Sequence, residues 1–244
     1  MSVNIRWTKL LLWAALIPGA AYADQMHFDG ANGAAFGGFY VSPYTATDQT
    51  LNHQIALYCL DFNHSIDFDQ TWSADINTLE ASNLSKFQYG GSTDFVVDPS
   101  DPAFDVFSRY KAAAWLFSQE GSAPGQRVLG VYQYAAWELF LEHSHQSEFN
   151  TALASIDSID PVTNHTFQYD VDQALMAAQI GGNYNSTDLS QWRVVSPVPA
   201  GRTDSVQEFL TPVPEPSAIL LLSSTILIGG FVAVRRRKSQ RSTT

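Results

Sequence analysis

The chain contains a single cysteine, Cys59, in the stretch ALYCLDFNH. A cysteine can act as a nucleophile or metal ligand when ionised, or pack in a core as a small apolar group. Packing is the usual role of a free cysteine in a strand, so Cys59 alone does not indicate chemistry. His64 lies five positions further along. That spacing along one strand and turn does not favour a Cys-His hydrolase dyad.

A second unusual residue is Gln133, in the stretch YQYAAW. The surrounding sequence predicts a helix whose apolar stripe is formed by Leu129, Tyr132, Ala136, Leu139 and Phe140. Gln133 lies one position from this stripe, four residues before Trp137. A surface side chain or a hydrogen-bonded buried amide is the ordinary expectation at such a position.

Together the two segments resemble bacterial surface thioester domains, first described on Gram-positive adhesins. That family has an aromatic-Cys-x-Asp segment on a strand and, downstream, a helix with a Thr-Gln-x-Ala-aliphatic-Trp motif. The matching residues here are Tyr58-Cys59-Leu60-Asp61 in the first segment and Gln133, Ala135 and Trp137 in the second, with RYKAAAWLF similar to the helix that precedes the motif. Two positions depart from the pattern: Tyr132 replaces the frequent Thr, and Ala136 replaces the common Ile.

The resemblance implies an internal thioester between Cys59 and Gln133. A thiolate attacks the carboxamide carbon and ammonia leaves, provided that the fold holds the two groups roughly 3–3.5 Å apart and excludes water. The residues expected to support the site are Tyr58, Asp61, Tyr132, Tyr134, Trp137 and Trp115. A partner's amine or hydroxyl would then open the bond and remain attached through Gln133. This is a single self-modification without turnover or cofactor, so the chain is not expected to be an enzyme.

Strands and helices at specific ranges must position these residues. In the stretch 53–62, Cys59 shares one face with Ile55, Leu57 and Asp61, and both faces are mostly apolar, which predicts a strand covered on two sides. Further expected elements are strands at 35–47 and 191–197 and helices at 105–119, 126–143, 147–159 and 169–180, with Asp105 as a cap. This pattern predicts an α+β fold. The resemblance implies a β-sandwich or barrel-like portion with an inserted helical subdomain.

The first 23 residues have the three parts of a secretory signal peptide. Arg6 and Lys9 precede the apolar run LLLWAALIPGA, and AYA offers small residues for cleavage. We therefore expect an exported domain that begins at Asp24 and extends over residues 24–200.

The other end predicts a membrane anchor. A linker at 201–217 contains Pro214-Glu215-Pro216, an apolar stretch follows at 218–234, and the tail 235–244 begins with Arg235, Arg236 and Arg237. Seventeen residues of helix reach roughly 25 Å, near the lower limit for a transmembrane helix, and the basic tail should stay cytoplasmic. This order resembles the PEP-CTERM sorting signal of Gram-negative bacteria that produce exopolysaccharide. The resemblance implies an exosortase partner, transient anchoring in the inner membrane, and release or re-anchoring at the cell surface.

The charge of the expected domain excludes one class of partner. Residues 24–211 contain 23 acidic and 6 basic residues, a net charge near −17. Phosphate backbones would repel such a domain, so we expect no nucleic-acid binding.

Metal sites are weakly indicated. His143 and His145 lack accompanying ligands at zinc spacing. The acidic turns could offer oxygen ligands to calcium, but without a complete loop signature they are better explained as solvated turns: Asp67 and Asp69, and Asp98, Asp101 and Asp105. One alternative from another class stays open: a non-reactive structural or carbohydrate-associated protein of the extracellular polysaccharide matrix, in which Cys59 and Gln133 only pack.

Overall fold

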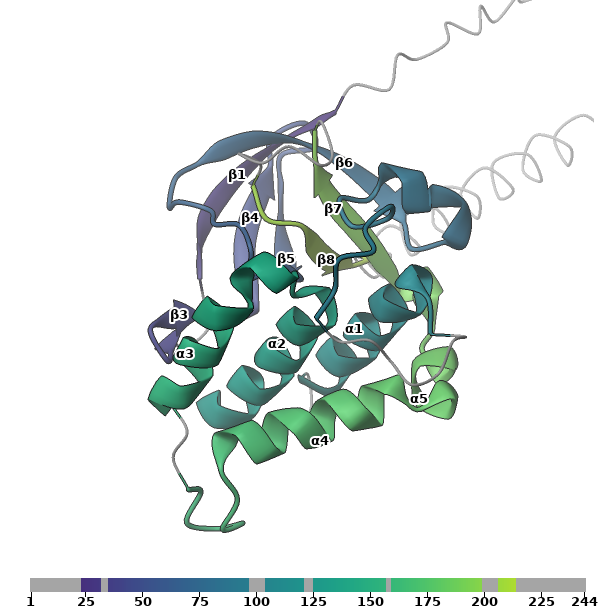
Figure 1. Ribbon diagram of the computed structural model, residues 1–244. Helices are drawn as coiled ribbons and strands as arrows, with labels where there is room; N and C mark the ends of the chain where they lie inside the picture. Colours follow the sequence, from purple (N-terminus) through teal and green to yellow (C-terminus); the bar gives the residue numbers. More distant parts are fainter. Residues whose placement is uncertain are drawn as a thin grey trace, which may run out of the picture.

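A computed structural model describes residues 23–31, 35–96, 104–120, 125–156, 159–198 and 206–213 (Figure 1). The expected signal peptide (apart from Ala23), the Pro-Glu-Pro motif, the apolar stretch 218–234 and the basic tail lie outside these ranges. Within the described ranges, no helix is long and apolar enough to cross a membrane.

Six antiparallel strands form a closed barrel in the order β1-β4-β5-β8-β7-β6. Their bounds are β1 Asp24–Ala31, β4 Tyr44–Asp48, β5 His53–Cys59, β6 Thr71–Thr78, β7 Trp192–Pro197 and β8 Phe209–Pro212. The strand β8 closes the barrel by pairing with both β5 and β7. The folded domain therefore continues past residue 200, into the segment that the sequence suggested as a linker.

The helices are inserted between β6 and β7, and α1–α5 lie together on one side of the barrel (Figure 1). They are α1 Val106–Glu120, α2 Gln126–Phe140, α3 Gln146–Ile156, α4 Phe167–Gln179 and α5 Gly181–Ser186, with short 3-10 helices η1 Ala81–Lys86, η2 His143–His145 and η3 Leu189–Gln191. Barrel and inserted helices together confirm the α+β expectation and the barrel-like portion.

The pair α1 and α2 is antiparallel, as the short connection between them predicts. Arg109 near the start of α1 donates from its guanidinium to the carbonyl of Leu139, near the end of α2, at 2.7 Å. Asp105 caps α1, because its carboxylate accepts a hydrogen bond from the N–H of Ser108 at 2.8 Å. The start and the orientation of this helix pair were thus both readable from sequence.

The stretch 35–47, expected as one strand, is divided into three. The short strands β2 Ala35–Phe36 and β3 Phe39–Tyr40 form a hairpin around Gly37 and Gly38, and β4 begins only at Tyr44. Both glycines have positive φ, 62° and 87°, a conformation that glycine adopts without steric cost. The expectation of one continuous strand is therefore wrong, because the two glycines form a turn.

Candidate functional site

Cys59 is the last residue of β5 and is fully buried. Its thiol donates to the carbonyl of Asp61 at 3.2 Å, and the sulfur accepts from the N–H of Asp61 and from the indole N–H of Trp137, each at 3.4 Å. Burial, with a smaller contribution from the Asp61 charge, raises the pKa of the thiol to about 12. The sulfur is therefore protonated at neutral pH, while two donors face the charge it would acquire on losing its proton.

Gln133 approaches Cys59 from α2. Its side chain is fully buried, and Nε2 donates to the backbone carbonyl of Cys59 at 2.7 Å. The sequence placed Gln133 beside the apolar stripe, but the structure places it within the buried face, while Leu129 and Tyr132 of that stripe are only partly buried. Two residues 74 positions apart in sequence are thus held together by a direct hydrogen bond.

Ser42, which the sequence analysis did not identify, completes the contacts of Gln133. Its N–H donates to Oε1 of Gln133 at 3.0 Å, and its hydroxyl donates to the same oxygen. The hydroxyl also accepts from the N–H of Cys59 at 2.9 Å. Ser42 lies opposite Cys59 because the pairing of Tyr44 with Leu57 between β4 and β5, continued by two residues, brings positions 42 and 59 together.

Asp61 lies in the turn that follows β5, and its carboxylate organises this turn. It accepts from the N–H groups of Asn63 and His64 at 2.7 and 3.1 Å, and its other oxygen lies 2.7 Å from Nδ1 of His64. The hydrogen bond to Asp61 is the main cause of the raised pKa of His64. Asp61 is thus a positioning residue for the turn, and His64 pairs with Asp61, not with the thiol.

Three expected supporting residues lie elsewhere. Tyr58 is on the opposite face of β5, where its ring packs on Phe117 of α1 and on Trp192, at centroid distances of 5.0 and 5.7 Å. Trp115 lines a separate surface cavity together with Trp192. Tyr132 is adjacent to Gln133 in the chain but only half-buried. Alternation along a strand turns Tyr58 away from the Cys59 thiol, and the 100° step along a helix turns Tyr132 away from Gln133.

The aromatic cover of the pair comes instead from Trp137 and its neighbours. The Trp137 ring packs on Tyr134, on Phe62 and on Phe39, at centroid distances of 4.9, 5.4 and 6.1 Å. Phe39 and Phe62, in the β2–β3 hairpin and in the turn after β5, were not predicted; neither has a local sequence signal. Trp137 and Tyr134 are thus the two expected aromatic residues that the structure places in this cluster.

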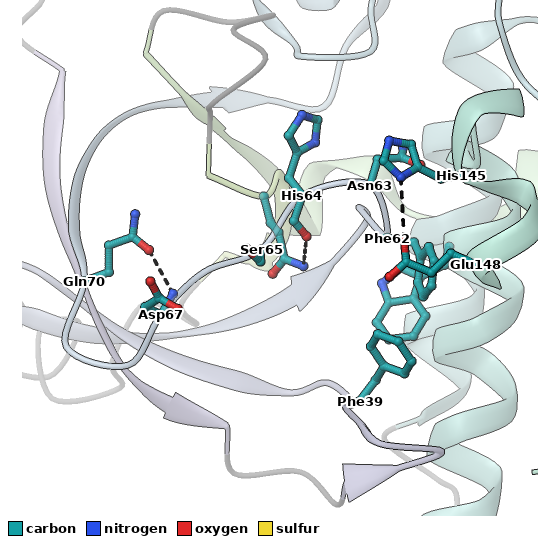
Figure 2. Close-up of a pocket in the computed structure, with 11 residues that line it drawn as sticks. Phe39, Phe62, Asn63, His64, Ser65, Asp67, Gln70, His145 and Glu148 are labelled. Atoms are coloured by element: carbon teal, nitrogen blue, oxygen red, sulfur yellow. Dashed lines mark hydrogen bonds and ion pairs between the residues drawn. The ribbon is translucent and has the colours of Figure 1, made fainter. Parts of the chain in front are cut away.

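A pocket of about 540 Å³ opens beside this cluster (Figure 2). Figure 2 shows it between the segment after β5, which carries Asn63 to Gln70, and the helical segment that carries His145 and Glu148. Its lining is Phe39, Phe62, Asn63, His64, Ser65, Asp67, Gln70, Trp137, His145, Glu148 and Gln207. Trp137, which is 2% exposed, both lines the pocket and donates to the Cys59 sulfur. One side chain therefore contacts both the pocket and the buried thiol.

Of the weak metal candidates, His143, His145 and Asp105 lie near or bond to other groups, and Asp98 and Asp101 lie outside the described chain. His143 pairs with Asp94 at 2.9 Å, and His145 lies 4.0 Å from Glu148. Asp98 and Asp101 are outside the described ranges, and Asp105 is the cap of α1. Among the described residues, no group of three or more His, Cys, Asp or Glu side chains could hold a metal ion.

Comparison of the chain with known proteins found no match among family models, curated proteins or solved structures. The chemistry open to this protein is therefore inferred from the geometry of this site. That geometry comprises a buried thiol, a buried carboxamide in contact with the backbone of Cys59, two donors on the carboxamide oxygen, and a pocket lined in part by the indole ring that donates to the sulfur.

Proposed function

We propose that this protein forms an internal thioester between Cys59 and Gln133 and uses it for covalent attachment to a partner that carries an amine or hydroxyl. The observation that carries the proposal is the buried contact between the two residues, in which the Gln133 carboxamide donates to the Cys59 carbonyl at 2.7 Å. Proximity of this kind converts a reaction between two molecules into an intramolecular one, which favours an otherwise slow attack on an amide.

The proposed step balances without a cofactor. The sulfur of Cys59 bonds to Cδ of Gln133, the bond from Cδ to Nε2 breaks, and the thiol hydrogen leaves with the nitrogen as ammonia. A later attack by a partner's amine or hydroxyl on Cδ breaks the bond to sulfur and returns the thiol of Cys59. The partner is then joined to Gln133 by an amide or an ester.

In this proposal, the partner's amine or hydroxyl enters through the pocket beside Trp137. It is lined by aromatic rings and by polar groups that include Asp67 and Glu148. We propose that displacement of the Trp137 ring admits a nucleophile seated there, whereas the ring in its present position helps to exclude water. The resting bond would be protected by the same side chain that admits the partner.

The alternative is that Gln133 only braces the fold. Both polar atoms of its amide have hydrogen-bond partners, as a structural buried amide requires. Under this alternative the chain is a non-reactive structural or carbohydrate-associated protein of the extracellular matrix. The two functions differ in covalent chemistry and can be separated by mass.

The test is treatment of the folded, purified protein with methylamine, followed by intact mass and thiol titration. The thioester predicts a mass gain of one methylamine and the release of one thiol, which can only be that of Cys59, the single cysteine. Peptide mapping should place the label on Gln133. Gln207, another buried glutamine, is an internal control and should stay unlabelled.

Cys59→Ala is the matched variant, because it removes the sulfur but leaves the backbone carbonyl that holds Gln133. It should gain no mass. If the untreated wild type instead shows a free thiol as soon as it is unfolded, and methylamine adds nothing, the bracing alternative is correct.

Export and sorting are the remaining part of the proposal. The signal-like residues 1–23, the motif Pro214-Glu215-Pro216, the apolar stretch 218–234 and the tail arginines support a surface or extracellular protein processed by an exosortase. Its partner would then be a surface protein or polysaccharide. Cell fractionation tests this part, and recovery of the folded body from the cytoplasm would contradict it.

A further inference from the structure

We infer that Ser42 is a catalytic residue of the proposed thioester site, holding in its two donors the negative charge that Oε1 of Gln133 acquires during attack. The inference rests on the proposed function but adds to it a residue that neither the motifs nor the resemblance contains. It concerns both halves of the chemistry, because Oε1 is the carbonyl oxygen of the amide that is consumed and of the thioester that forms.

The geometry is that of an oxyanion hole supplied by one residue. The N–H of Ser42 lies 3.0 Å from Oε1 of Gln133, and the Ser42 hydroxyl donates to the same atom. Ser42 and Gln133 are both fully buried, so water does not compete for this oxygen. Donors preorganised in a buried site need no rearrangement when charge develops, which is why they are effective there.

The direction of each hydrogen bond is fixed by the partners. The N–H of Cys59 can only donate, so it uses a lone pair of the Ser42 hydroxyl at 2.9 Å and leaves the hydroxyl hydrogen for Oε1. Turning the Gln133 amide over would bring its NH₂ against the N–H of Ser42 and its oxygen against the Cys59 carbonyl. Both contacts would be repulsive, so the carbonyl oxygen must face Ser42.

The same hydroxyl also links the two reacting residues. Because the Ser42 hydroxyl contacts both the backbone N–H of Cys59 and the side-chain oxygen of Gln133, it bridges the end of β5 and α2. When the sulfur bonds to Cδ, the electron pair of the C=O bond moves to Oε1, between the two donors. When the C–N bond breaks, the pair returns and ammonia leaves with the thiol hydrogen.

The test measures how fast the thioester forms. Ammonia should open the bond by the reverse of its formation, restoring the thiol and the Gln133 amide. After ammonia is removed, intact mass follows the loss of one ammonia per chain. Loss of one donor from such a site slows reactions by about 10²–10³-fold in enzymes, so Ser42→Ala should slow formation by roughly 100-fold. Methylamine cleavage of any thioester that does form should be slowed as well.

Two further variants separate catalysis from folding. Ser196→Ala removes another fully buried serine hydroxyl of the barrel, one that donates to Glu208, and should form the thioester at the wild-type rate. Ser42→Thr keeps a hydroxyl and should restore at least part of the rate that Ser42→Ala loses. Thermal unfolding of Ser42→Ala in the Cys59→Ala background, where no thioester can form, measures the structural contribution of the hydroxyl by itself.

The outcomes distinguish this inference from the function on which it rests. Equal rates for wild type, Ser42→Ala and Ser196→Ala would overturn the role of Ser42 and leave the thioester standing. A wild type that never shows the mass of a thioester would overturn the proposed function, and the role of Ser42 with it. The inference is supported if Ser42→Ala forms the thioester slowly while its thermal unfolding, measured in the Cys59→Ala background, matches that of Ser196→Ala in the same background.

Discussion

At the scale of single residues, burial sets the reactivity of the site. Cys59 and Gln133 are both fully buried, and burial is the largest cause of the raised pKa of the thiol. The indole N–H of Trp137 is a favourable contact for sulfur, since it lowers that pKa against the effect of burial. Trp137 therefore has two roles in the proposed reaction, as a donor to sulfur and as a cover towards the pocket.

The substitution Trp137→Phe removes the indole N–H that donates to sulfur but keeps an aromatic ring over the site, so it tests the hydrogen bond by itself. The phenyl ring keeps an apolar group at the pocket, but the sulfur loses a hydrogen bond and the pKa of Cys59 should rise further. A single hydrogen bond contributes about 0.5–1.5 kcal/mol net, so thioester formation should slow by roughly 3- to 10-fold. The rate is measured by mass after ammonia treatment.

Tyr134→Phe is the matched control for this change. It also removes one polar hydrogen from a buried aromatic residue of α2, but the Tyr134 hydroxyl donates towards the carbonyl of Phe36 and not to sulfur. Its rate of thioester formation should stay near wild type. Equal rates for the two variants would show that the indole N–H does not act on the sulfur.

At the scale of elements, the β2–β3 hairpin closes over the site. Phe39 of β3 packs on Trp137 and on Phe62, at centroid distances of 6.1 and 5.2 Å. The hairpin turns at Gly37, where an added Cβ would lie 2.9 Å from the Tyr134 hydroxyl and 3.0 Å from Ile156. The lack of a side chain at Gly37 therefore allows the hairpin to approach α2 and α3.

Gly37→Ala should loosen this hairpin. The substitution combines a positive φ of 62° with a steric clash, and the free energy of unfolding should fall by about 1–3 kcal/mol. Gly38→Ala is the control, because Gly38 also has positive φ but its added Cβ meets no atom of the described residues within 4 Å. Chemical denaturation of both variants in the Cys59→Ala background measures the difference, and an equal loss for the two would contradict the packing argument.

At the scale of the whole molecule, three acidic side chains are largely shielded from water, and one of them, Glu208, links a helix to the barrel. Glu208 precedes β8 and accepts from Tyr110 of α1 at 2.5 Å and from Ser196 of β7 at 2.6 Å. Burial raises the pKa of Glu208 to about 7, and that of Glu138 likewise to about 7. Burial raises the pKa of Glu120, which is 5% exposed at the end of α1, to about 9.

These shifts predict that stability falls as pH rises. Each carboxyl binds a proton in the folded chain at pH values where the unfolded chain, with a pKa near 4.5, has already lost it. The contribution is therefore complete below pH 4.5 and is lost as pH rises to the folded pKa. The loss is about 1.4 kcal/mol per pH unit for each group within its window. The loss of stability from Glu138 and Glu208 is complete near pH 7, whereas the loss from Glu120 extends to about pH 9.

The substitution Glu120→Gln tests the loss of stability between about pH 7 and pH 9, which is assigned to Glu120. Neither carboxylate oxygen of Glu120 has a hydrogen-bond partner in the described part of the chain, so an amide there loses no contact and avoids the buried charge. The melting temperature should change less between pH 7 and pH 9 in Glu120→Gln than in wild type, and should be higher at pH 9. Parallel melting curves for the two proteins across that range would refute the assignment.

Elements with a local apolar period were predictable from the sequence, whereas features formed by distant segments were not. The helices and the strand that carries Cys59 were predictable, because their apolar residues recur with the local period of each element. The β2–β3 hairpin, the strand β8 and the residues Ser42 and Phe39 were not. Their roles depend on pairing and packing between distant segments, for which a short stretch of sequence carries no periodic signal.

The sequence by itself determined that one thiol exists, that an unusual glutamine lies on a helix downstream, and that strands precede and follow the helical insertion. Only the tertiary structure decided that α2 brings Gln133 to the end of β5, that Ser42 contacts both residues, and that Trp137 contacts the sulfur and lines the pocket. The physical reason is that the identity of a side chain is local. Its hydrogen-bond partners and its exclusion from water are set by chain closure over 74 residues between Cys59 and Gln133, and over 91 between Ser42 and Gln133.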